Sequence, residues 1–287
     1  MPELPEIEAM RRYLISKISG EVITQVDTYN HTVIRYPSPN EFKESLKTAR
    51  LDQIRRLGKI LHLTFVKHEV TPEQLHLYID HGLTGRIRWG SSSKKFPKKS
   101  VFSIEFSNQI KLLYHDRRLH GAIWLYKSKS QEHLPIPEKF KKFGPDILEI
   151  TYQEFKSRLK KFRGEIKGIL TNQTFVVGIG NAYADEILFS ANVHPFTKRN
   201  QLTEENIEGI FSSCHKILLN ATKMILNILE KTDILDNEKN WRNQIMAIHL
   251  KEGTPCPVCG SKISLIKAHR QTNFCRKCQI SKNPNFI

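Results

Sequence analysis

The start of the chain places its apolar residues at helical spacing. Ile7, Met10, Leu14 and Ile18 recur every three or four positions within PEIEAMRRYLISKIS, residues 5–19. In an α-helix with about 3.6 residues per turn, side chains at this spacing share one face. The pattern therefore predicts an amphipathic helix at the beginning of the protein.

From about residue 21 to residue 126 the pattern changes to short runs with β character. These runs are EVITQV, ILHLTFV, LHLYI, VFSIEF, IKLLYH and AIWLY. Turn-rich pieces, including SSSKKFPKKS at residues 91–100, separate them. Regularly recurring short strands are typical of a β-sandwich or a β-barrel. Together with the first helix, they predict an N-terminal domain over residues 1–126.

Helical patterns dominate the second half of the chain. They follow a polar, proline-bearing segment at residues 127–146, which we interpret as a linker. The helical stretches are TYQEFKSRLKKF, EIKGILTNQ, NAYADEILFSA and TEENIEGIFSSCHKILLNATKMILNILEK. They predict a helical domain over residues 147–246, and a small cysteine-containing module over residues 247–287 completes the chain. The expected fold class is therefore α+β with several domains.

Four of the five cysteines form two C-x-x-C pairs separated by fifteen residues: Cys256, Cys259, Cys275 and Cys278. This spacing allows four thiolates to surround one zinc ion. Two disulfides are the alternative, but the chain begins without a secretory signal and leaves one thiol over, Cys214. Four protein ligands leave no open position, so the zinc is expected to be structural and to contribute folding energy. Cys214 lies in a helical stretch and is expected to be a small core residue.

The charge of the chain points to a polyanionic partner. Lys and Arg number 45 against 29 Asp and Glu, which gives a formal net charge of +16. Such an excess on an enzyme-sized chain of 287 residues favours nucleic acid, although a generically basic protein is the alternative. No apolar run approaches the ~18–20 residues of a membrane helix, so we expect no membrane partner. The start resembles no signal peptide, which predicts a cytoplasmic location.

Three stretches, in this order, resemble the formamidopyrimidine-DNA glycosylase/endonuclease VIII family. They are PELPEIE at residues 2–8, VVGIGNAYADEILFSANVHP at residues 176–195 and the terminal CPVCG…R…CRKCQ. The resemblance runs from residue 2 to about residue 279. It implies an N-terminal helix with a β-sandwich, then a helical domain with a helix–two-turns–helix element, then a zinc finger. This architecture agrees with the pattern described above.

The resemblance also implies an activity. Members of this family are bifunctional DNA glycosylases/AP lyases of base-excision repair, which remove oxidised bases from damaged double-stranded DNA. We accordingly expect a monomer with one structural Zn²⁺, associated with the nucleoid if the protein is bacterial. Two alternatives stay open. One is a zinc-finger protein that recognises DNA damage without catalysis, and the other is an RNA-binding or ribosome-associated protein.

Pro2 is the expected nucleophile. Removal of Met1 would make Pro2 the N-terminal residue, and an α-amine with a pKa of about 7.7–8.0 is partly neutral at pH 7. Such an amine can attack C1′ of a damaged nucleotide, displace the base and leave a Schiff base, as lysine amines do in other enzymes. The alternative is that Pro2 merely starts a helix.

Other acidic and basic residues match the catalytic pattern of the family. The resemblance makes Glu3 the general acid and Glu6 a supporting residue, although Glu6 could simply favour the first helical turn. Lys59, in RRLGKILHLTF, resembles a lysine that contacts the lesion's phosphate and assists elimination, whereas a surface lysine is the alternative. Arg270 precedes Cys275 by five residues, like the arginine that grips a phosphate and takes part in the final elimination.

Further residues are expected to bind DNA. Asn181 lies in GIGNAYADE, where backbone N–H groups before a helix can face a phosphate. Arg163 falls where the family has a basic DNA contact, although a solvated helix face would also explain it. Leu83 in HGLTGR and Arg118 and His120 in DRRLHG occupy the positions of the residues that fill the gap left by a flipped base.

Two departures from the family pattern concern the substrate. Purine-type members have Met, Arg and Phe where this chain has Leu83, Leu119 and His120. They also carry a glycine-rich stretch with an Asp-Tyr pair after the long helix, whereas this chain has EKTDILDNEKNWRNQ. We favour 8-oxoguanine or formamidopyrimidine lesions, with oxidised pyrimidines as the alternative.

Overall fold

The computed structural model describes residues 2–67, 73–91, 100–129, 135–232, 238–267 and 270–280. They form two compact units. The first contains Pro2, Glu6–Lys141 and the end of a long helix from Leu226. The second contains Glu3–Pro5, Lys142–Ile225 and the residues from 238 onward. Two parts of the sequence discussed above lie partly outside the described residues. They are the turn predicted at residues 91–100 and the segment after the long helix that differs from the family pattern.

The first unit is a β-sandwich with two sheets. Strands β1 (Ile23–Thr28), β7 (Ser100–Phe106), β8 (Ile110–Asp116) and β6 (Gly85–Ser91) form one antiparallel sheet in this order. The other sheet has the order β2 (Ile34–Tyr36), β9 (Ala122–Ser128), β5 (Glu73–Asp80), β4 (Ile60–Lys67) and β3 (Arg50–Leu57), in which only β2 and β9 pair in parallel. A short helix, α2 (Pro39–Leu46), follows β2. The predicted sandwich is therefore confirmed.

The two faces of the five-stranded sheet differ in chemistry. Registered residues of β4, β5 and β9 such as Leu63, Leu77 and Leu125 are buried and form an apolar face. On the opposite face His62 Nε2 lies 3.2 Å from His76 Nδ1, and the rings of His62 and Tyr78 stack with centroids 4.2 Å apart. Burial lowers the pKa of His62 to about 3. This imidazole is therefore neutral near pH 7.

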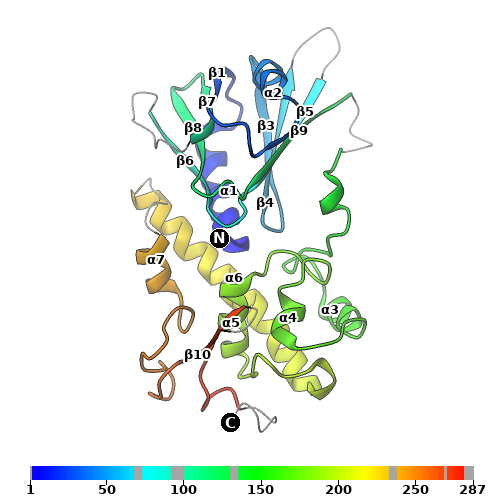
Figure 1. Ribbon diagram of the computed structural model, residues 1–287, viewed down its shortest axis with the longest axis vertical. Helices are drawn as coiled ribbons and strands as arrows, with labels where there is room; N and C mark the ends of the chain where they lie inside the picture. Colours follow the sequence, from blue (N-terminus) through cyan, green and yellow to red (C-terminus); the bar gives the residue numbers. More distant parts are fainter. Residues whose placement is uncertain are drawn as a thin grey trace. The chain divides into compact units, whose positions relative to one another are not determined.

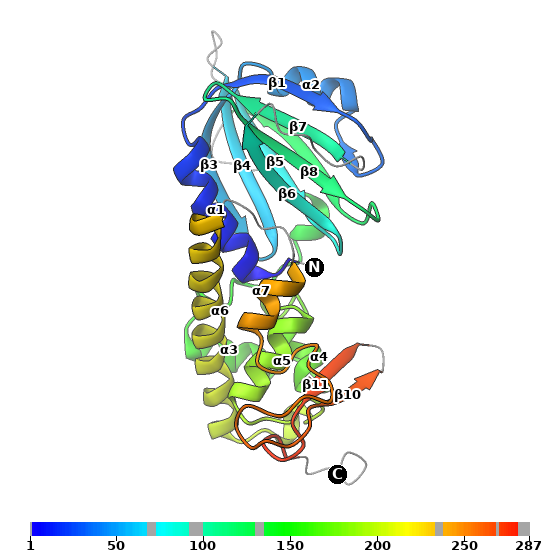
Figure 2. The ribbon, with the colours of Figure 1, turned by 90° about the vertical axis from the view of Figure 1, so that its left-hand side faces the viewer.

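Helix α1 (Leu4–Ile18) packs against both sheets (Figure 1, Figure 2). The four residues predicted to share a face, Ile7, Met10, Leu14 and Ile18, are all buried, which confirms the amphipathic helix. The ring of Tyr13 lies 5.2 Å from that of Trp89 in β6, and Arg11 donates to the carbonyl of Ile54 in β3.

Glu8 in α1 accepts hydrogen bonds from three arginines. Arg11 Nη2 and Arg12 Nε approach its Oε1 at 2.8 Å, and Arg56 Nε of β3 approaches its Oε2 at 3.2 Å. Burial by itself would raise the pKa of this carboxyl, but the hydrogen bonds from Arg11 and Arg12 and the charge of Arg56 outweigh it and lower the pKa to about 2. The ionised carboxylate therefore joins the helix to the sheet.

This depressed pKa predicts a pH-dependent contribution to stability. Because the folded pKa lies below the ordinary value of 4.5, the contribution of Glu8 is present above about pH 4.5 and is lost as the pH falls toward 2. Denaturant unfolding of wild-type protein and the Glu8→Gln variant should show a stability difference that is largest above pH 5 and shrinks toward pH 2. A difference that stays constant over this range would contradict the assignment.

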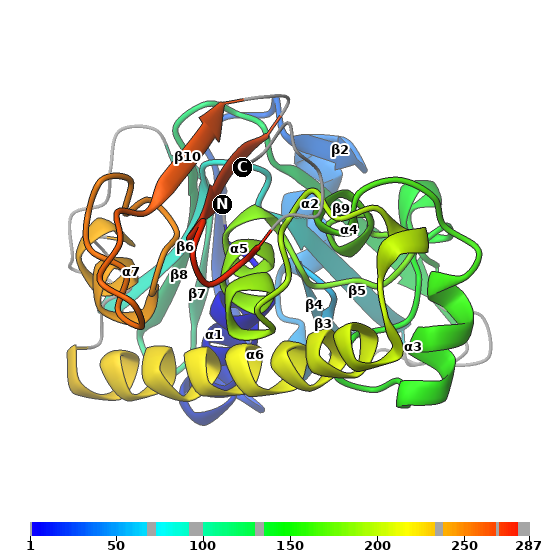
Figure 3. The same ribbon diagram turned by 90° about the horizontal axis from the view of Figure 1, so that it is seen from below.

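The second unit is helical. Helices α3 (Tyr152–Leu159), α4 (Ile166–Leu170), α5 (Asn181–Ser190) and part of α6 (Glu204–Thr232) share one core (Figure 3). This core includes Phe155, Ile166, Tyr183 and Cys214, so the expectation that Cys214 is a small core residue is confirmed. Helix α7 (Glu238–Ile245) and the hairpin of β10 (Ser264–Lys267) and β11 (Gln271–Phe274) follow. None of the described helices is long and apolar enough to cross a membrane.

Candidate active site and cysteine cluster

Glu3 lies in a cradle of backbone N–H groups. Its carboxylate accepts hydrogen bonds from the N–H groups of Gly180 at 2.7 Å, Ala182 at 3.0 Å and Tyr183 at 3.4 Å. These groups form the N-terminus of α5, where unpaired N–H groups and the helix dipole favour an anion. A Cβ at position 180 would lie 2.2 Å from the Glu3 carboxyl carbon, so a larger residue there would displace this carboxylate.

This cradle corrects one expectation. The sequence predicted that backbone N–H groups in GIGNAYADE can face a phosphate, but three N–H groups of this stretch donate to Glu3 of the same chain. Pro2 precedes Glu3 directly and is buried. Pro2 is therefore the chain neighbour of a residue whose carboxylate is fixed. Glu6 is also buried, in the first turn of α1.

Asn181 and the residue after Arg270 are brought together at the start of strand β11. Asn181 Nδ2 donates to the carbonyl of Gln271 at 2.8 Å, and Lys167 Nζ donates to the same oxygen at 2.8 Å. Arg270 is exposed and directly precedes Gln271. Two of the predicted DNA-binding residues, far apart in the sequence, therefore share one corner of the C-terminal unit.

A buried carboxylate, Asp185 of α5, joins this corner to the surrounding elements. Its Oδ1 lies 2.6 Å from Lys167 Nζ, and its Oδ2 lies 2.8 Å from His249 Nδ1. The same Oδ2 accepts hydrogen bonds from the backbone N–H and the side-chain amide of Asn273 in β11. Burial lowers the pKa of Lys167. The attraction of the Asp185 carboxylate acts in the opposite direction but is smaller.

Sequence reasoning missed Lys167 and Asp185. Each is a charged residue within a short helix that is otherwise largely buried. A charged residue in a largely apolar helical stretch can be noticed in the sequence, but the sequence does not show which residue neutralises its charge. The neighbouring Glu186 accepts backbone hydrogen bonds from Ala247, Ile248 and His249 at 2.8–3.0 Å, which ties α5 to the segment after α7.

Lys59 lies in the tight turn between β3 and β4. Gly58 has a φ of +58°, which favours glycine, and Leu57 pairs with Ile60 across the turn. Strand β4 begins at Ile60, where the predicted run ILHLTFV begins. Lys59 is half-buried. The turn therefore fixes the backbone at the base of the lysine side chain.

The residues expected to fill the gap of a flipped base lie on two loops of the N-terminal unit. Leu83, 49% exposed, lies between β5 and β6, and the exposed Arg118 and His120 lie between β8 and β9. Such exposure of a large apolar side chain is what a wedge between bases requires.

Asp116 joins these two loops. Thr84 Oγ1 donates to Asp116 Oδ1 at 2.5 Å, and the backbone N–H of Gly121 donates to Asp116 Oδ2 at 2.7 Å. The backbone N–H of Arg118 contacts both Thr84 Oγ1 and Asp116 Oδ1, at 3.0 and 3.2 Å. The buried carboxylate therefore holds the two loops together and fixes the bases of their exposed side chains.

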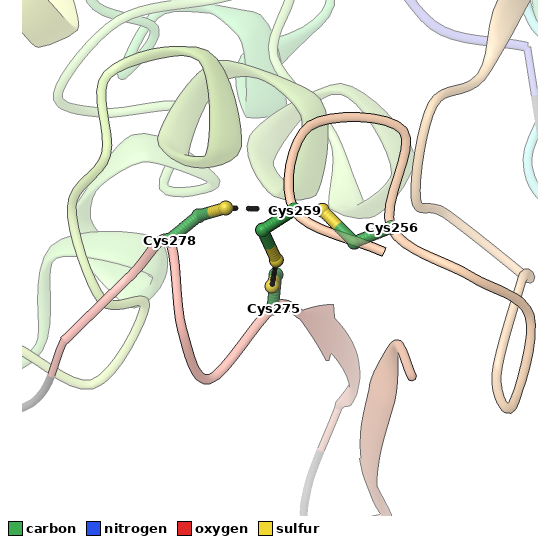
Figure 4. Close-up of side chains that lie close together, drawn as sticks. All are labelled: Cys256, Cys259, Cys275 and Cys278. Atoms are coloured by element: carbon green, nitrogen blue, oxygen red, sulfur yellow. Dashed lines mark hydrogen bonds between the residues drawn. The ribbon is translucent and has the colours of Figure 1, made fainter. Parts of the chain in front are cut away.

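The four predicted ligands converge, as Figure 4 shows. The sulfur atoms of Cys256, Cys259, Cys275 and Cys278 all lie within 4.8 Å of one another. Cys259 and Cys275 are 3.4 Å apart and Cys256 and Cys278 are 3.8 Å apart, so these thiols are free rather than joined in disulfides. Sulfur ligands at about 2.3 Å from a tetrahedral ion would be separated by about 3.8 Å. The cluster can therefore hold a metal ion.

Comparison with known proteins identifies the class to which this architecture belongs. Residues 1–123 match the family model of the formamidopyrimidine-DNA glycosylase N-terminal domain, and residues 143–232 match that of the formamidopyrimidine-DNA glycosylase H2TH (helix–two-turns–helix) domain. The fold and these two matches define a DNA glycosylase of base-excision repair with a helix–two-turns–helix domain.

Relatives over the whole length make the assignment more specific. The chain is 31% identical to the formamidopyrimidine-DNA glycosylase of Desulforamulus reducens, with 98% of this chain and 100% of that protein covered. It is also 31% identical to that of Ligilactobacillus salivarius, with 99% and 100% covered. The chain therefore belongs to the formamidopyrimidine-DNA glycosylase family.

Solved structures agree with this assignment. The Lactococcus lactis enzyme in complex with DNA containing an abasic site superimposes with a TM-score of 0.81 at 28% identity, covering 97% of this chain and 100% of that one. The same enzyme with DNA containing N7-benzyl-Fapy-dG gives a TM-score of 0.82 at 27% identity, with 98% and 100% covered.

Proposed function

We propose that the protein is a bifunctional DNA glycosylase and AP lyase that removes oxidised bases from duplex DNA. The observation that carries this proposal is the position of Glu3. Its carboxylate is held by three N–H groups at the N-terminus of α5, directly beside the residue that would become the N-terminal amine. A purely DNA-binding module has no use for a buried carboxylate fixed at such an amine.

The chemistry follows from these two residues. After removal of Met1, the Pro2 nitrogen attacks C1′ of the damaged nucleotide, and the C1′–N bond to the base breaks. The base leaves with the bonding electron pair, and Glu3 would take the proton released by the Pro2 nitrogen and pass it to the departing group or to the opening sugar. The C1′–O4′ bond then breaks as O4′ takes up a proton, and the lone pair of the Pro2 nitrogen forms the C=N bond of an iminium ion, which acidifies C2′–H. Loss of that proton then expels the 3′ phosphate and nicks the strand.

The remaining predicted residues would bind the DNA. Lys59, Arg163, Asn181 and Arg270 are proposed to hold backbone phosphates, because cations and side-chain amides are the usual donors to phosphate oxygens. The corner where Asn181 meets Gln271 supports this role for Asn181 and Arg270. Leu83, Arg118 and His120 are proposed to fill the space of the flipped nucleotide from the two loops that Asp116 joins.

For the base itself, we propose 8-oxoguanine or formamidopyrimidine. Among the solved structures to which this chain is similar is the Lactococcus lactis enzyme bound to DNA containing Fapy-dG. Wild-type protein should be incubated with duplexes that carry 8-oxoguanine, a formamidopyrimidine, thymine glycol or an abasic site, and both released base and borohydride-trapped adduct should be measured. Preferred excision of thymine glycol would reassign the enzyme to oxidised pyrimidines. Tight binding without any adduct would contradict the lyase.

We propose that the metal is one structural Zn²⁺, because four thiolates in two C-x-x-C pairs suit this ion. Cys256 and Cys275 belong to a small core with Phe189, Ile248 and Ile263 that is too small to be stable by itself. The metal would therefore supply folding energy to the hairpin that carries Arg270.

Removal of the metal should consequently release this hairpin. A strong chelator is expected to weaken binding to duplex DNA and to increase hydrogen exchange at residues 271–274, while exchange in β4 and β5 stays unchanged. Zinc content measured before and after treatment shows how much metal was removed. Unaltered DNA binding by fully metal-free protein would contradict the proposed role.

A further inference from the structure

An acidic side chain lies where three loops of the N-terminal unit meet. Asp80 is the last residue of β5, and it pairs with Ile60 of β4 on one side and with Ala122 of β9 on the other (Figure 1). Lys59 lies directly before β4, the turn that carries Leu83 follows Asp80, and the loop after β8 leads into β9. Like charges that meet at an interface repel each other, so a carboxylate beside loops proposed to approach phosphates requires a neutralising partner.

One oxygen of Asp80 holds the turn that carries Leu83. Asp80 Oδ1 accepts a hydrogen bond from the backbone N–H of Gly82 at 3.0 Å. Gly82 has a φ of +51°, and a Cβ there would lie 2.5 Å from the carbonyl oxygen of His120, so the two gap-filling loops touch at this glycine. The Asp80 side chain therefore fixes the backbone directly before Leu83.

The other oxygen of Asp80 forms an ion pair with Lys139. This lysine belongs to a short 3₁₀ helix, η1 (Glu138–Phe140), within the segment predicted to be a linker. Its Nζ also lies 4.8 Å from the centroid of the Trp124 ring in β9 and 5.2 Å from that of Phe140. The buried Phe140 packs edge-on against Trp124, with ring centroids 5.3 Å apart. The ammonium group is therefore held by an anion and two aromatic rings, unlike an ordinary surface ion pair.

We propose that Lys139 is a positioning residue for Leu83 and acts through Asp80. This inference rests on the proposed function, because it assumes that Leu83 enters the gap left by a flipped base. With Lys139 in place, Asp80 holds the N–H of Gly82 without presenting an uncompensated negative charge to the phosphates of the DNA. Without Lys139, that charge repels the DNA, and the carboxylate is free to rotate away from Gly82.

The test measures how fast the protein unstacks DNA, separately from binding and folding. The duplex carries a tetrahydrofuran abasic analogue beside 2-aminopurine, whose fluorescence rises when it leaves the base stack. Lys139→Met removes the cation and should slow this rise by roughly tenfold or more, because small displacements of a positioned group cost rate steeply. Its free energy of unfolding should change little, since the ion pair is partly exposed. Lys139→Arg keeps the charge and should keep most of the rate.

A second substitution separates the charge of Asp80 from its hydrogen bond. In Asp80→Asn combined with Lys139→Met both charges are absent, but the Asn oxygen can still accept from Gly82, so the unstacking rate should recover. Asp80→Ala removes the acceptor and should be slow even with Lys139 present. Lys141→Met is the matched control, because it breaks an ion pair with Glu138 at the end of the same 3₁₀ helix that does not include Asp80.

Each outcome decides between the alternatives. Wild-type protein that neither unstacks nor traps on abasic DNA would contradict the proposed function, and the role of Lys139 with it. If the wild type does both and Lys139→Met unstacks at the wild-type rate, only the positioning role is refuted. If the double variant stays as slow as Lys139→Met, the lysine acts by itself rather than through Asp80, which overturns the proposal. A loss of unfolding free energy that parallels the loss of rate would leave only a structural contact and would also refute it.

Discussion

A residue that stays attached in front of Pro2 is expected to abolish covalent trapping of the protein on abasic DNA. The attachment converts the Pro2 amine into an amide, whose nitrogen lone pair is delocalised and cannot attack C1′. Loss of a covalent nucleophile commonly costs several orders of magnitude in rate, so we expect a decrease on the order of a thousandfold or more. Borohydride trapping on an abasic duplex measures it directly.

The control is a protein that keeps a free amine at the same position. Pro2→Gly, with Met1 removed, presents a primary amine, which can also form an imine, so trapping should persist at a reduced rate. DNA binding by the blocked protein should stay close to that of the wild type, because the DNA-binding residues are unaltered. Trapping by the blocked protein at the wild-type rate would refute Pro2 as the nucleophile.

Features set by local sequence were predictable. The spacing of Ile7, Met10, Leu14 and Ile18 identified the buried face of α1, because helical periodicity is a property of the segment alone. The two C-x-x-C pairs identified the cysteine cluster for a similar reason, since each pair is a short turn with its own geometry. The recurrence of short apolar runs predicted a sandwich or a barrel, although it could not give the order of strands in each sheet.

Features that depend on distant partners were not predictable from the residues. The N–H groups around Gly180 look like a phosphate site until the fold brings Glu3, 177 residues away, into their reach. Likewise Lys167 and Asp185 appear as isolated charges in the sequence, and only tertiary structure shows that they neutralise each other. The charge of a residue shows that it needs a partner when it is buried, but the sequence does not show which distant segment provides that partner.

The buried Asp185 supports the largest expected effect on stability. Its carboxylate contacts Lys167, His249 and Asn273, which belong to three different segments of the C-terminal unit. Asp185→Asn keeps the shape but removes the charge, which leaves the Lys167 ammonium buried and unpaired. Breaking a buried pair in this way costs about 3–5 kcal/mol, so we expect the free energy of unfolding to fall by a comparable amount.

The reason for this loss can be tested with a second substitution. Asp185→Asn combined with Lys167→Met removes both charges, and replacing a whole buried pair by groups of similar volume is often close to neutral. The double variant should therefore recover much of the lost stability, as measured by denaturant unfolding, while Asp52→Asn on the exposed side of β3 should change little. Its DNA binding should be weaker than that of the wild type, because residue 167 no longer holds the carbonyl of Gln271, next to Arg270. Equal destabilisation in the single and double variants would mean that the hydrogen bonds to His249 and Asn273, rather than the charge of Lys167, make Asp185 necessary.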